Sequence, residues 1–551
     1  MNKIRFRSLT ILTVLVVVLA AHSQVRPPDA ADTAMLNRIW LEGANNSRVM
    51  EHLSWITDVF GPRIPGSPAY NKAAEWAAKR FTELGLSGAA VEPAGEFGLG
   101  WSYEYVSAHM TSPSYMPLLA YPRPWTGSTK GRISGSPVLA PVASKADMDK
   151  HRGKLKGAIV LVGGPRAVRP NFSAPAKRLD DKDLRELEET PIPVKREGPG
   201  GSGPPGGLKW EEVEEFYRTE EVGVLLEPSS GSRSDFGTVK VDAYGGRGKD
   251  FVTRGQSPRL IVAAEQYNRI CRILDLKVPV TLEVEVRTTT HDADTKSYNV
   301  TAEIPGTDKK DELVMLGGHL DSWTAGTGAV DDAAGCAVAM EAVRILKALG
   351  VKPRRTIRAA LWTGEEEGFF GSRGYVVRHF GDTDTGQLAK LDLFDAALEK
   401  NERNPLGDSK KFLAKPDYAK ISGYYNYDNG SGRIRGVYIQ ENFQVRPIFE
   451  AWMKPLKDLG VTTIALQNTD GTDHLPFDYA GIPGFQFIQD PLDYFPGLHH
   501  TSQDVYDHAV AEDLVQSAVV MAYFVYQTAM REDLLPRKPL PIPVEMPGKG
   551  K

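Results

Sequence analysis

The chain has 551 residues, of which 41% are hydrophobic and 25% charged, and 66 basic against 70 acidic residues give a net charge of −4. This composition is typical of a globular protein and excludes a collagen, a coiled coil and a disordered chain. The charge provides no basic stripe for nucleic acid, and 2 cysteines are too few for a disulfide scaffold or a thiolate-rich zinc module. At roughly 100–200 residues per domain, the length predicts more than one domain.

Residues 1–23 predict a cleaved signal peptide. Basic residues in the first seven positions precede an apolar run over 9–21, and an Ala-His-Ser sequence before Gln24 fits a cleavage site. The run is shorter than the roughly 20 residues that a membrane span needs. We therefore expect a secreted or periplasmic protein with no membrane anchor after cleavage.

The segment that follows predicts helices and then strands. Apolar residues at helical spacing cover 33–60 and 70–84, and Pro/Gly-rich stretches separate the two helices. Residues 88–125 alternate and carry aromatic side chains, which indicates strands.

Residues 130–290 differ in their pattern of apolar, charged and Gly/Pro residues from the flanking sequence. A helix is predicted over 210–219, and residues 180–208 are charged and then rich in Gly and Pro, which indicates an exposed flexible insertion. Apolar strands are predicted over 158–162, 222–226, 259–264 and 278–288.

From Ser297 onward, short apolar strands alternate with helices. This alternation predicts an α/β sheet covered on both faces. The strands lie over 299–304, 313–316, 356–362 and 483–488, with helices over 335–349 and 511–530. The Pro-rich residues 536–551 predict a disordered tail.

Acidic and histidine residues concentrate where these strands end, which is where open α/β sheets place ligand sites. His319 follows one strand, and Glu365 and Glu366 follow another. Asp331 and Asp332 stand together before a helix, where a single Asp would be explained as a cap.

Further candidates lie downstream. Asp428 precedes Asn-Gly, so it could equally form an Asx turn, and His474, His499 and His500 stand in later loops. The order His, Asp, Glu-Glu, Asp, His predicts a dinuclear metal site in which one carboxylate bridges two cations about 3.5–4 Å apart. Nitrogen and oxygen ligands suit two Zn²⁺, with Co²⁺ or Mn²⁺ as alternatives. The sequence contains no His-Glu-x-x-His, no Gly-x-Ser-x-Gly and no P-loop.

Taken together, these motifs resemble the M28 family of metallopeptidases, which includes aminopeptidases and carboxypeptidase Q-like enzymes. The resemblance covers about 60–140 and 295–530. It implies a three-layer α/β zinc-exopeptidase sandwich with a central mixed β-sheet. The matching motifs are GPRIPGSP (61–68), GGHLDS (317–322), DDAAG (331–335), EEEGFFGS (365–372), NYD (426–428), TDHLPF (472–477) and HHTSQD (499–504).

The resemblance implies metal ligands at five positions. Asp331 bridges the ions, and His319 and Asp428 complete one site. Glu366 and His500 complete the other, His500 being chosen over its neighbour because it directly precedes Thr-x-x-Asp.

Three further residues have catalytic roles by the same resemblance. Glu365 is the general base that activates the attacking water, and Asp321 orients His319. His474 lies near the substrate and stabilises the tetrahedral oxyanion. The resemblance also implies a cis peptide bond between Asp331 and the residue after it.

The resemblance also divides the chain into segments. Residues 130–290 resemble a mostly-β protease-associated (PA) domain inserted into the catalytic domain, with 180–208 departing from that pattern. The predicted parts are the signal peptide (1–23), the catalytic domain in two pieces (24–129 and 291–535), the PA-like insertion (130–290) and the tail (536–551).

We therefore expect a secreted dinuclear zinc exopeptidase that acts on peptides or dipeptides and that the resemblance suggests is a homodimer. The alternatives are a glutaminyl cyclase-like enzyme with one zinc, a non-catalytic receptor-like ectodomain and an M20-type amidohydrolase. The choice between aminopeptidase and carboxypeptidase or dipeptidase stays open, although residues 100–113 favour carboxypeptidase Q-like dipeptidases.

Overall fold

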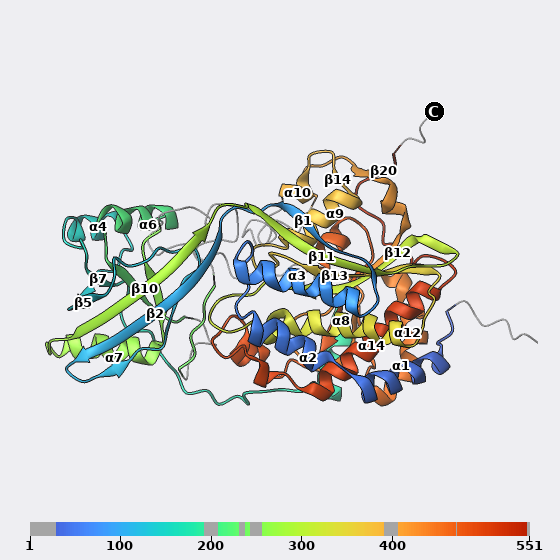
Figure 1. The fold of residues 1–551 in the computed structure, drawn as a ribbon, viewed down its shortest axis with the longest axis horizontal. Coiled ribbons are helices and arrows are strands. Elements are labelled where there is room, and N and C mark those ends of the chain that lie inside the picture. The colour runs from blue at the N-terminus through green and yellow to red at the C-terminus, as the bar shows by residue number, and fades with distance from the viewer. Residues whose placement is uncertain are drawn as a thin grey trace, which may run out of the picture.

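The computed structural model describes residues 29–191, 208–230, 237–242, 256–390, 406–469 and 471–547. The expected signal peptide lies outside these residues. The chain forms a large α/β lobe and a smaller lobe, and long strands run from one to the other (Figure 1).

The large lobe is built on an eight-stranded mixed sheet of order β1-β11-β13-β12-β16-β19-β17-β18. Neighbours β13, β12, β16 and β19 are parallel, whereas β1, β11 and β17 introduce antiparallel pairs. The strands are β1 (Ser87–Glu96), β11 (Lys296–Ile304), β12 (Lys309–His319), β13 (Arg355–Trp362), β16 (Ile421–Asn426), β17 (Ile434–Tyr438), β18 (Thr463–Ala465) and β19 (Gly484–Gln489).

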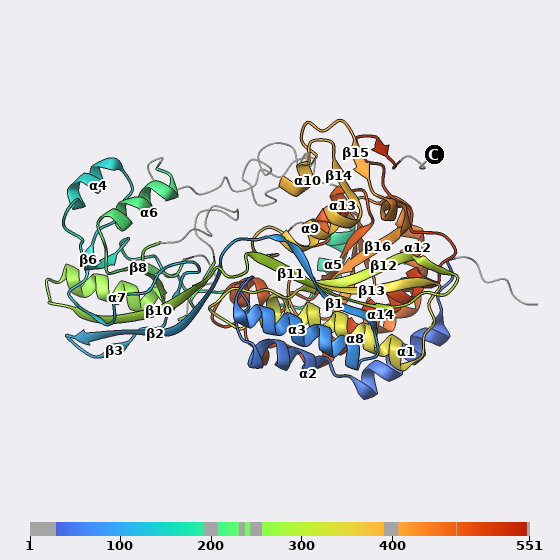
Figure 2. The same ribbon diagram turned by 45° about the horizontal axis from the view of Figure 1, so that its top comes forward.

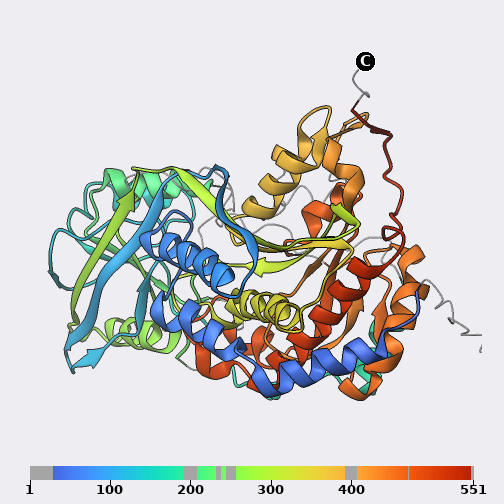
Figure 3. The ribbon, with the colours of Figure 1, turned by 45° about the vertical axis from the view of Figure 1, so that its right-hand side comes forward.

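Helices cover both faces of this sheet (Figures 1 and 3). Alternate residues of β12 point into the two cores, with Val314 and Leu316 on one side and Met315 on the other. The first core packs against α1 (Thr33–Asn46), α2 (Val49–Ser54), α3 (Pro68–Glu83), α8 (Ala334–Ala348), α12 (Arg446–Met453) and α14 (Ala511–Met530), and the second against α9 (Phe370–His379), α10 (Gln387–Lys390) and α13 (Leu475–Tyr479). The expected central mixed sheet between helical layers is confirmed.

Helix α8 is buried from Ala334 to Leu346, its charged residues Glu341 and Arg344 included, because it packs against the sheet, α14 and α2. Its fixed position matters for the site, since the acidic pair Asp331-Asp332 directly precedes it.

The smaller lobe holds two sheets of order β3-β2-β10-β5 and β4-β9-β8-β7-β6. Helices α4 (Lys145–His151), α6 (Trp210–Thr219) and α7 (Ala264–Asp275) belong to this lobe (Figure 2). Its strands are β2 (Gly100–Ser112), β3 (Met116–Pro117), β4 (Ala120–Pro122), β5 (Ile133–Gly135), β6 (Val138–Leu139), β7 (Ile159–Leu161), β8 (Val224–Pro228), β9 (Arg259–Val262) and β10 (Thr281–His291).

The smaller lobe begins before the expected boundary at residue 130. Strand β2 pairs antiparallel with β10 along its length, and Met110 and Leu282 pack into the core of this lobe. The alternating pattern predicted a strand here but could not tell which sheet the strand joins. The lobe therefore begins between β1 and β2.

Part of the expected flexible insertion is a helix. Asp180 and Asp183 form a reciprocal capping box at the start of α5 (Asp181–Glu189), which packs against β18 of the large lobe. Just before it, Arg178 pairs with Asp490 at 3.0 Å and with Asp513 at 2.7 Å. Residues 192–207 lie outside the described residues.

The tail does not match the expected disorder over 536–547. Strand β20 (Val544–Glu545) pairs with β15 (Phe412–Ala414), and Lys538 Nζ lies 2.7 Å from Asp478 Oδ1. Figure 3 shows this extended red segment along the edge of the large lobe. A Pro-rich stretch lacks helical spacing, yet its extended backbone can still pack on a surface. Across the described ranges, no helix is both long and apolar enough to cross a membrane.

Candidate metal centre

The candidate site lies where neighbouring parallel strands of the central sheet end. Strand β12 ends at His319, which pairs with Trp362 at the end of β13, and β16 flanks β12 on its other side. Because the carboxyl ends of parallel strands meet at one edge, short turns bring Glu365, Glu366 and Asp428 close to His319.

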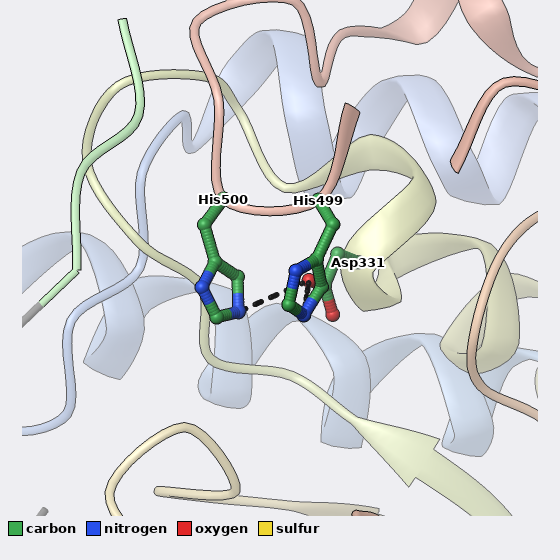
Figure 4. Close-up of side chains that lie close together, drawn as sticks. All are labelled: Asp331, His499 and His500. Carbon is green, nitrogen blue, oxygen red and sulfur yellow. Dashed lines mark ion pairs between the residues drawn. The ribbon is translucent and has the colours of Figure 1, made fainter. Parts of the chain in front are cut away.

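Asp331 lies in the kinked segment Ala329–Ala333 before α8, where its backbone is not helical, and it stands between two histidines. Its Oδ1 is 3.3 Å from His319 Nε2, and its Oδ2 is 3.5 Å from His500 Nε2. Figure 4 shows His499 and His500 on one loop with their imidazoles directed toward the Asp331 carboxylate. Each carboxylate oxygen of Asp331 thus faces a different histidine.

The remaining candidates extend these two groups. Glu366 Oε2 is 2.9 Å from His500 Nε2, whereas Asp428 Oδ2 is 3.8 Å from His319 Nε2. Glu365 Oε2 is 3.9 Å from the same nitrogen of His319. The structure therefore brings together all the expected ligands and the expected general base.

The second member of the acidic pair has a structural task. Asp332 Oδ1 accepts the backbone N–H of Gly335 at 3.0 Å, and Oδ2 accepts that of His319 at 3.2 Å. Asp332 thus connects the first turn of α8 to the end of β12, while Asp331 faces the histidines. The peptide bond between them is cis, as the resemblance implied.

Asp321 contacts His319 mainly through its backbone. The carbonyl of Asp321 is 3.1 Å from His319 Nδ1, whereas its carboxylate Oδ1 is 3.7 Å away. That carboxylate accepts the backbone N–H groups of Glu365 and Glu366, each at 3.2 Å. Asp321 therefore connects one histidine to the loop that carries both glutamates.

The donor atoms fit a metal centre. His319 Nε2, Asp331 Oδ2 and Glu366 Oε1 are buried, and within the described part of the chain none has a hydrogen-bond partner. Buried polar atoms without partners are rare in proteins unless an ion or water satisfies them. Two groups, Asp331/His499/His500 and His319/Asp332/Asp428, each hold donor atoms within 4.8 Å of one another.

Burial and mutual repulsion perturb the protonation of these groups. Burial raises the pKa of Glu365 well above its ordinary value, and Asp428 and Glu366 raise it further. Burial, reinforced by Asp331, raises the pKa of Asp428 to about 6. Burial opposes a charge on His500, but the carboxylates of Glu366 and Asp242 outweigh it and raise its pKa to about 9. Such clustered shifts are typical of functional sites.

His474 lies away from this cluster of charges. Its Nε2 lies 2.8 Å from the side-chain amide nitrogen of Gln440 and 3.2 Å from the backbone carbonyl of Thr469. Burial lowers the pKa of His474 to about 3, so its imidazole is neutral. Its role at the oxyanion stays a prediction.

The sequence did not predict a role at the site for two carboxylates that the structure places there. Asp504 Oδ1 accepts the backbone N–H of Val330 at 2.6 Å and so supports the turn that holds Asp331. Asp504 is the last residue of the HHTSQD motif, and this position could have marked it as a candidate site residue. Asp242 comes from the smaller lobe and lies 3.9 Å from His500 Nδ1, and no local motif surrounds it.

Comparisons with known proteins agree with this geometry. A family model described as peptidase family M28 matches residues 299–401 and 395–525. Carboxypeptidase Q of Pongo abelii is 28% identical over 280 residues, which are 51% of each chain. Leupeptin-inactivating enzyme 1 of Streptomyces exfoliatus is 32% identical over 188 residues, or 34% of each chain. The match thus spans about half the length of the first curated relative.

Solved structures share the fold. A peptidase M28 precursor from Shewanella amazonensis superposes with a TM-score of 0.60 at 23% identity, covering 92% of this chain and 98% of that one. BSAP, a zinc aminopeptidase from Bacillus subtilis, superposes with a TM-score of 0.52 at 17% identity, covering 88% and 95%. Both structures therefore share the mixed α/β fold of this chain.

Proposed function

We propose that the chain is a metallo-exopeptidase of peptidase family M28 that acts near one terminus of a peptide or dipeptide. The observation that carries the proposal is the position of Asp331, whose two oxygens face His319 at 3.3 Å and His500 at 3.5 Å. This arrangement supports two Zn²⁺ ions, with Co²⁺ or Mn²⁺ as alternatives.

The ligands divide into two sets that share Asp331. His319 and Asp428 would hold one ion, and Glu366 and His500 would hold the other. Bound zinc would polarise the scissile carbonyl and lower the pKa of water at the site.

Glu365 is the general base in this proposal. Its buried carboxylate lies among the ligands, and burial raises its pKa, which suits a group that takes up a proton during the reaction. Glu365 removes the proton of the attacking water and later delivers it to the leaving amine. Asp321 keeps the Glu365 backbone in place through the 3.2 Å hydrogen bond to its N–H.

His474 stabilises the tetrahedral oxyanion in this proposal. Nε2 of His474 is engaged by the Gln440 amide at 2.8 Å and the Thr469 carbonyl at 3.2 Å, whereas Nδ1 is buried without a hydrogen-bond partner among the described residues. With its proton on Nδ1, the neutral imidazole can donate to a developing negative charge.

The alternatives fit the site less well. A receptor-like ectodomain would not need a complete ligand set around unpartnered buried atoms, and a cyclase with one zinc would not need Asp331 to face two histidines. Export through the signal peptide, assignment of the smaller lobe as a PA-like domain and homodimerisation are further parts of the proposal that rest on the sequence.

A Glu365→Gln substitution tests the assignment of the base. Turnover of peptide substrates should fall at least about 100-fold, the lower end for a general base, while the zinc content stays at about two ions per chain. The matched control is Glu367→Gln in the same acidic run, which should retain activity. An active Glu365→Gln enzyme would show that another group accepts the proton, and a loss of zinc would make Glu365 a ligand instead.

The attacked terminus is tested with one tripeptide in three forms: free, acetylated at its amino end and amidated at its carboxyl end. Both kinds of enzyme cleave the free tripeptide. Of the two blocked forms, an aminopeptidase cleaves only the amidated one and a carboxypeptidase only the acetylated one. Peptides with amino-terminal Gln serve as the comparison for cyclase activity. Cyclisation of such a peptide without cleavage of any tripeptide would overturn the peptidase proposal.

A further inference from the structure

A short segment of the smaller lobe pairs with the loop that carries His500. Val241 donates its backbone N–H to the His500 carbonyl at 2.9 Å, and Ser502 donates its N–H to the Val239 carbonyl at 2.9 Å. Lys240 and Thr501 form an antiparallel bridge between these bonds. Residues 239–241 therefore act as an added strand beside the candidate metal ligand.

Asp242 follows this pairing directly and places its carboxylate near the imidazole of His500. Its Oδ2 is 3.9 Å from His500 Nδ1, and Lys240 Nζ lies 2.8 Å from the same oxygen. Arg123 donates to the backbone carbonyl of Asp242 at 3.0 Å. Arg123 is itself held by Glu227 on β8 at 2.8 Å, so the position of Asp242 depends on the sheet of the smaller lobe.

The two sides of the His500 ring face different surroundings. Nε2 faces Glu366 and Asp331 on the metal side, whereas Nδ1 is buried and lacks a hydrogen-bond partner within the described ranges. A metal-bound histidine almost always donates its other ring N–H to a carboxylate, a carbonyl or water. Asp242 supplies the carboxylate on that side.

The ring of His319 has a different kind of partner on the side away from the candidate metal centre. His319 Nδ1 lies 3.1 Å from the carbonyl of Asp321, which belongs to the large lobe and to the same loop. The partner of His319 is thus local, whereas the partner of His500 comes from a different lobe.

We propose that Asp242 is a positioning residue for His500, which makes one of the two metal sites depend on the smaller lobe. The inference rests on the proposed function, because it takes His500 as a ligand. When the ion is bound, the Asp242 carboxylate accepts the N–H of His500 Nδ1, fixes the ring and increases its basicity. Without Asp242, only the ion held by Glu366 and His500 should bind more weakly.

Zinc titration of the full-length metal-free protein against a chromophoric chelator tests this inference. The wild type should bind two ions per chain. Asp242→Ala should weaken one of the two by about 10–100-fold, as for other partners of metal-bound histidines, and leave the other within about twofold. Asp242→Asn keeps an oxygen that can accept the N–H, so it should lose less affinity than Asp242→Ala. The control Asp275→Ala removes an exposed carboxylate from the same lobe and should bind as the wild type does.

The outcomes separate this inference from the proposed function. Two unchanged ions in Asp242→Ala would overturn the role of Asp242 and leave the peptidase proposal standing. Equal weakening of both ions, to the same extent in the Ala and Asn variants, would mean that residues 239–242 act only in docking the lobes, and it would also overturn the inference. A wild type that binds no zinc and cleaves no peptide would instead refute the proposed function.

Discussion

Arg63 ties the loop between β12 and Asp331 to the start of the large lobe. Its guanidinium is fully buried, and Nε donates to the Leu320 carbonyl at 2.6 Å. The two terminal nitrogens donate to Thr327 at 2.6 Å and Gly328 at 3.0 Å. Five donors in a fixed planar fork can satisfy several carbonyls at once, which an ammonium group cannot do.

Arg63→Lys should therefore destabilise the metal-free protein by at least about 3 kcal/mol, because buried carbonyls lose charged donors. Urea unfolding in the presence of a chelator measures the effect. The exposed Arg152→Lys exchange is the control and should change the free energy of unfolding by less than about 0.5 kcal/mol. Equal stability of Arg63→Lys and the wild type would contradict the assigned role.

Sequence reasoning reached the residues at strand ends and missed those that support them from a distance. His319, Glu366 and Asp428 each follow an apolar strand, and parallel strands bring such positions together. Some partners of this cluster lie in recognised motifs, but nothing in the local sequence shows which residues they contact. Val239 and Ser502 are 263 positions apart, and Arg63 and Leu320 are 257 apart, so only the folded chain shows their contacts.

At the scale of elements, helix α2 places a histidine against helix α8. His52 is fully buried, and its Nε2 lies 3.8 Å from Glu341 Oε2 on α8. Burial lowers the pKa of His52 to about 3, and the nearby charges of Arg80, Arg344 and Arg48 act in the same direction. The Glu341 carboxylate does not offset this lowering of the His52 pKa, because it accepts hydrogen bonds from the Arg344 guanidinium at 2.9 Å.

This shift predicts a loss of stability in acid. The folded pKa of about 3 lies below the unfolded value of 6.5, so the unfolded chain binds the proton first and stability declines as the pH falls below 6.5. Between pH 6.5 and 5, His52 should cost the wild type about 2 kcal/mol. Urea unfolding of metal-free wild type and His52→Gln across this range measures the difference. Parallel pH profiles for the two proteins would contradict the assignment.

Elements were easier to predict than their partners. Alternation indicated strands over 88–125, but β1 joins the central sheet and β2 the smaller lobe. Period two identifies a strand and its buried face, whereas the sheet it joins depends on which other strand it meets. For the same reason, a Pro-rich sequence predicted a free tail, although β20 pairs with β15.

At the scale of the whole molecule, segments of both lobes converge on the candidate metal centre. The large lobe provides the expected ligands from its strand ends and from the loops that carry Asp331 and His500, and residues 239–242 approach from the smaller lobe. The geometry of the site therefore depends on the association of the two lobes as well as on the fold of the central sheet.

Metal binding should stabilise the entire fold. Asp331, Glu366 and Asp428 are buried side by side, and burial raises the pKa of Glu366 and Asp428 because their charges are poorly solvated. Cations bound only by the folded state relieve this cost, with a gain of about 2.7 kcal/mol for one site at a hundredfold excess over its Kd. Thermal unfolding should therefore occur at a higher temperature with zinc than with a chelator. The gain should shrink as the pH falls, because the ligands must lose their protons to bind.

Asp331→Ala tests whether this gain comes from the shared site. Removal of the carboxylate that faces both histidines should abolish most of the zinc-dependent rise in Tm, whereas a control Asp382→Ala variant, altered away from the centre, should keep it. Loss of only half of the rise would mean that Asp331 serves one ion, because a bridging ligand contributes to both sites. An equal Tm with zinc and with chelator in the wild type would show that the buried carboxylates bind no metal in the folded state.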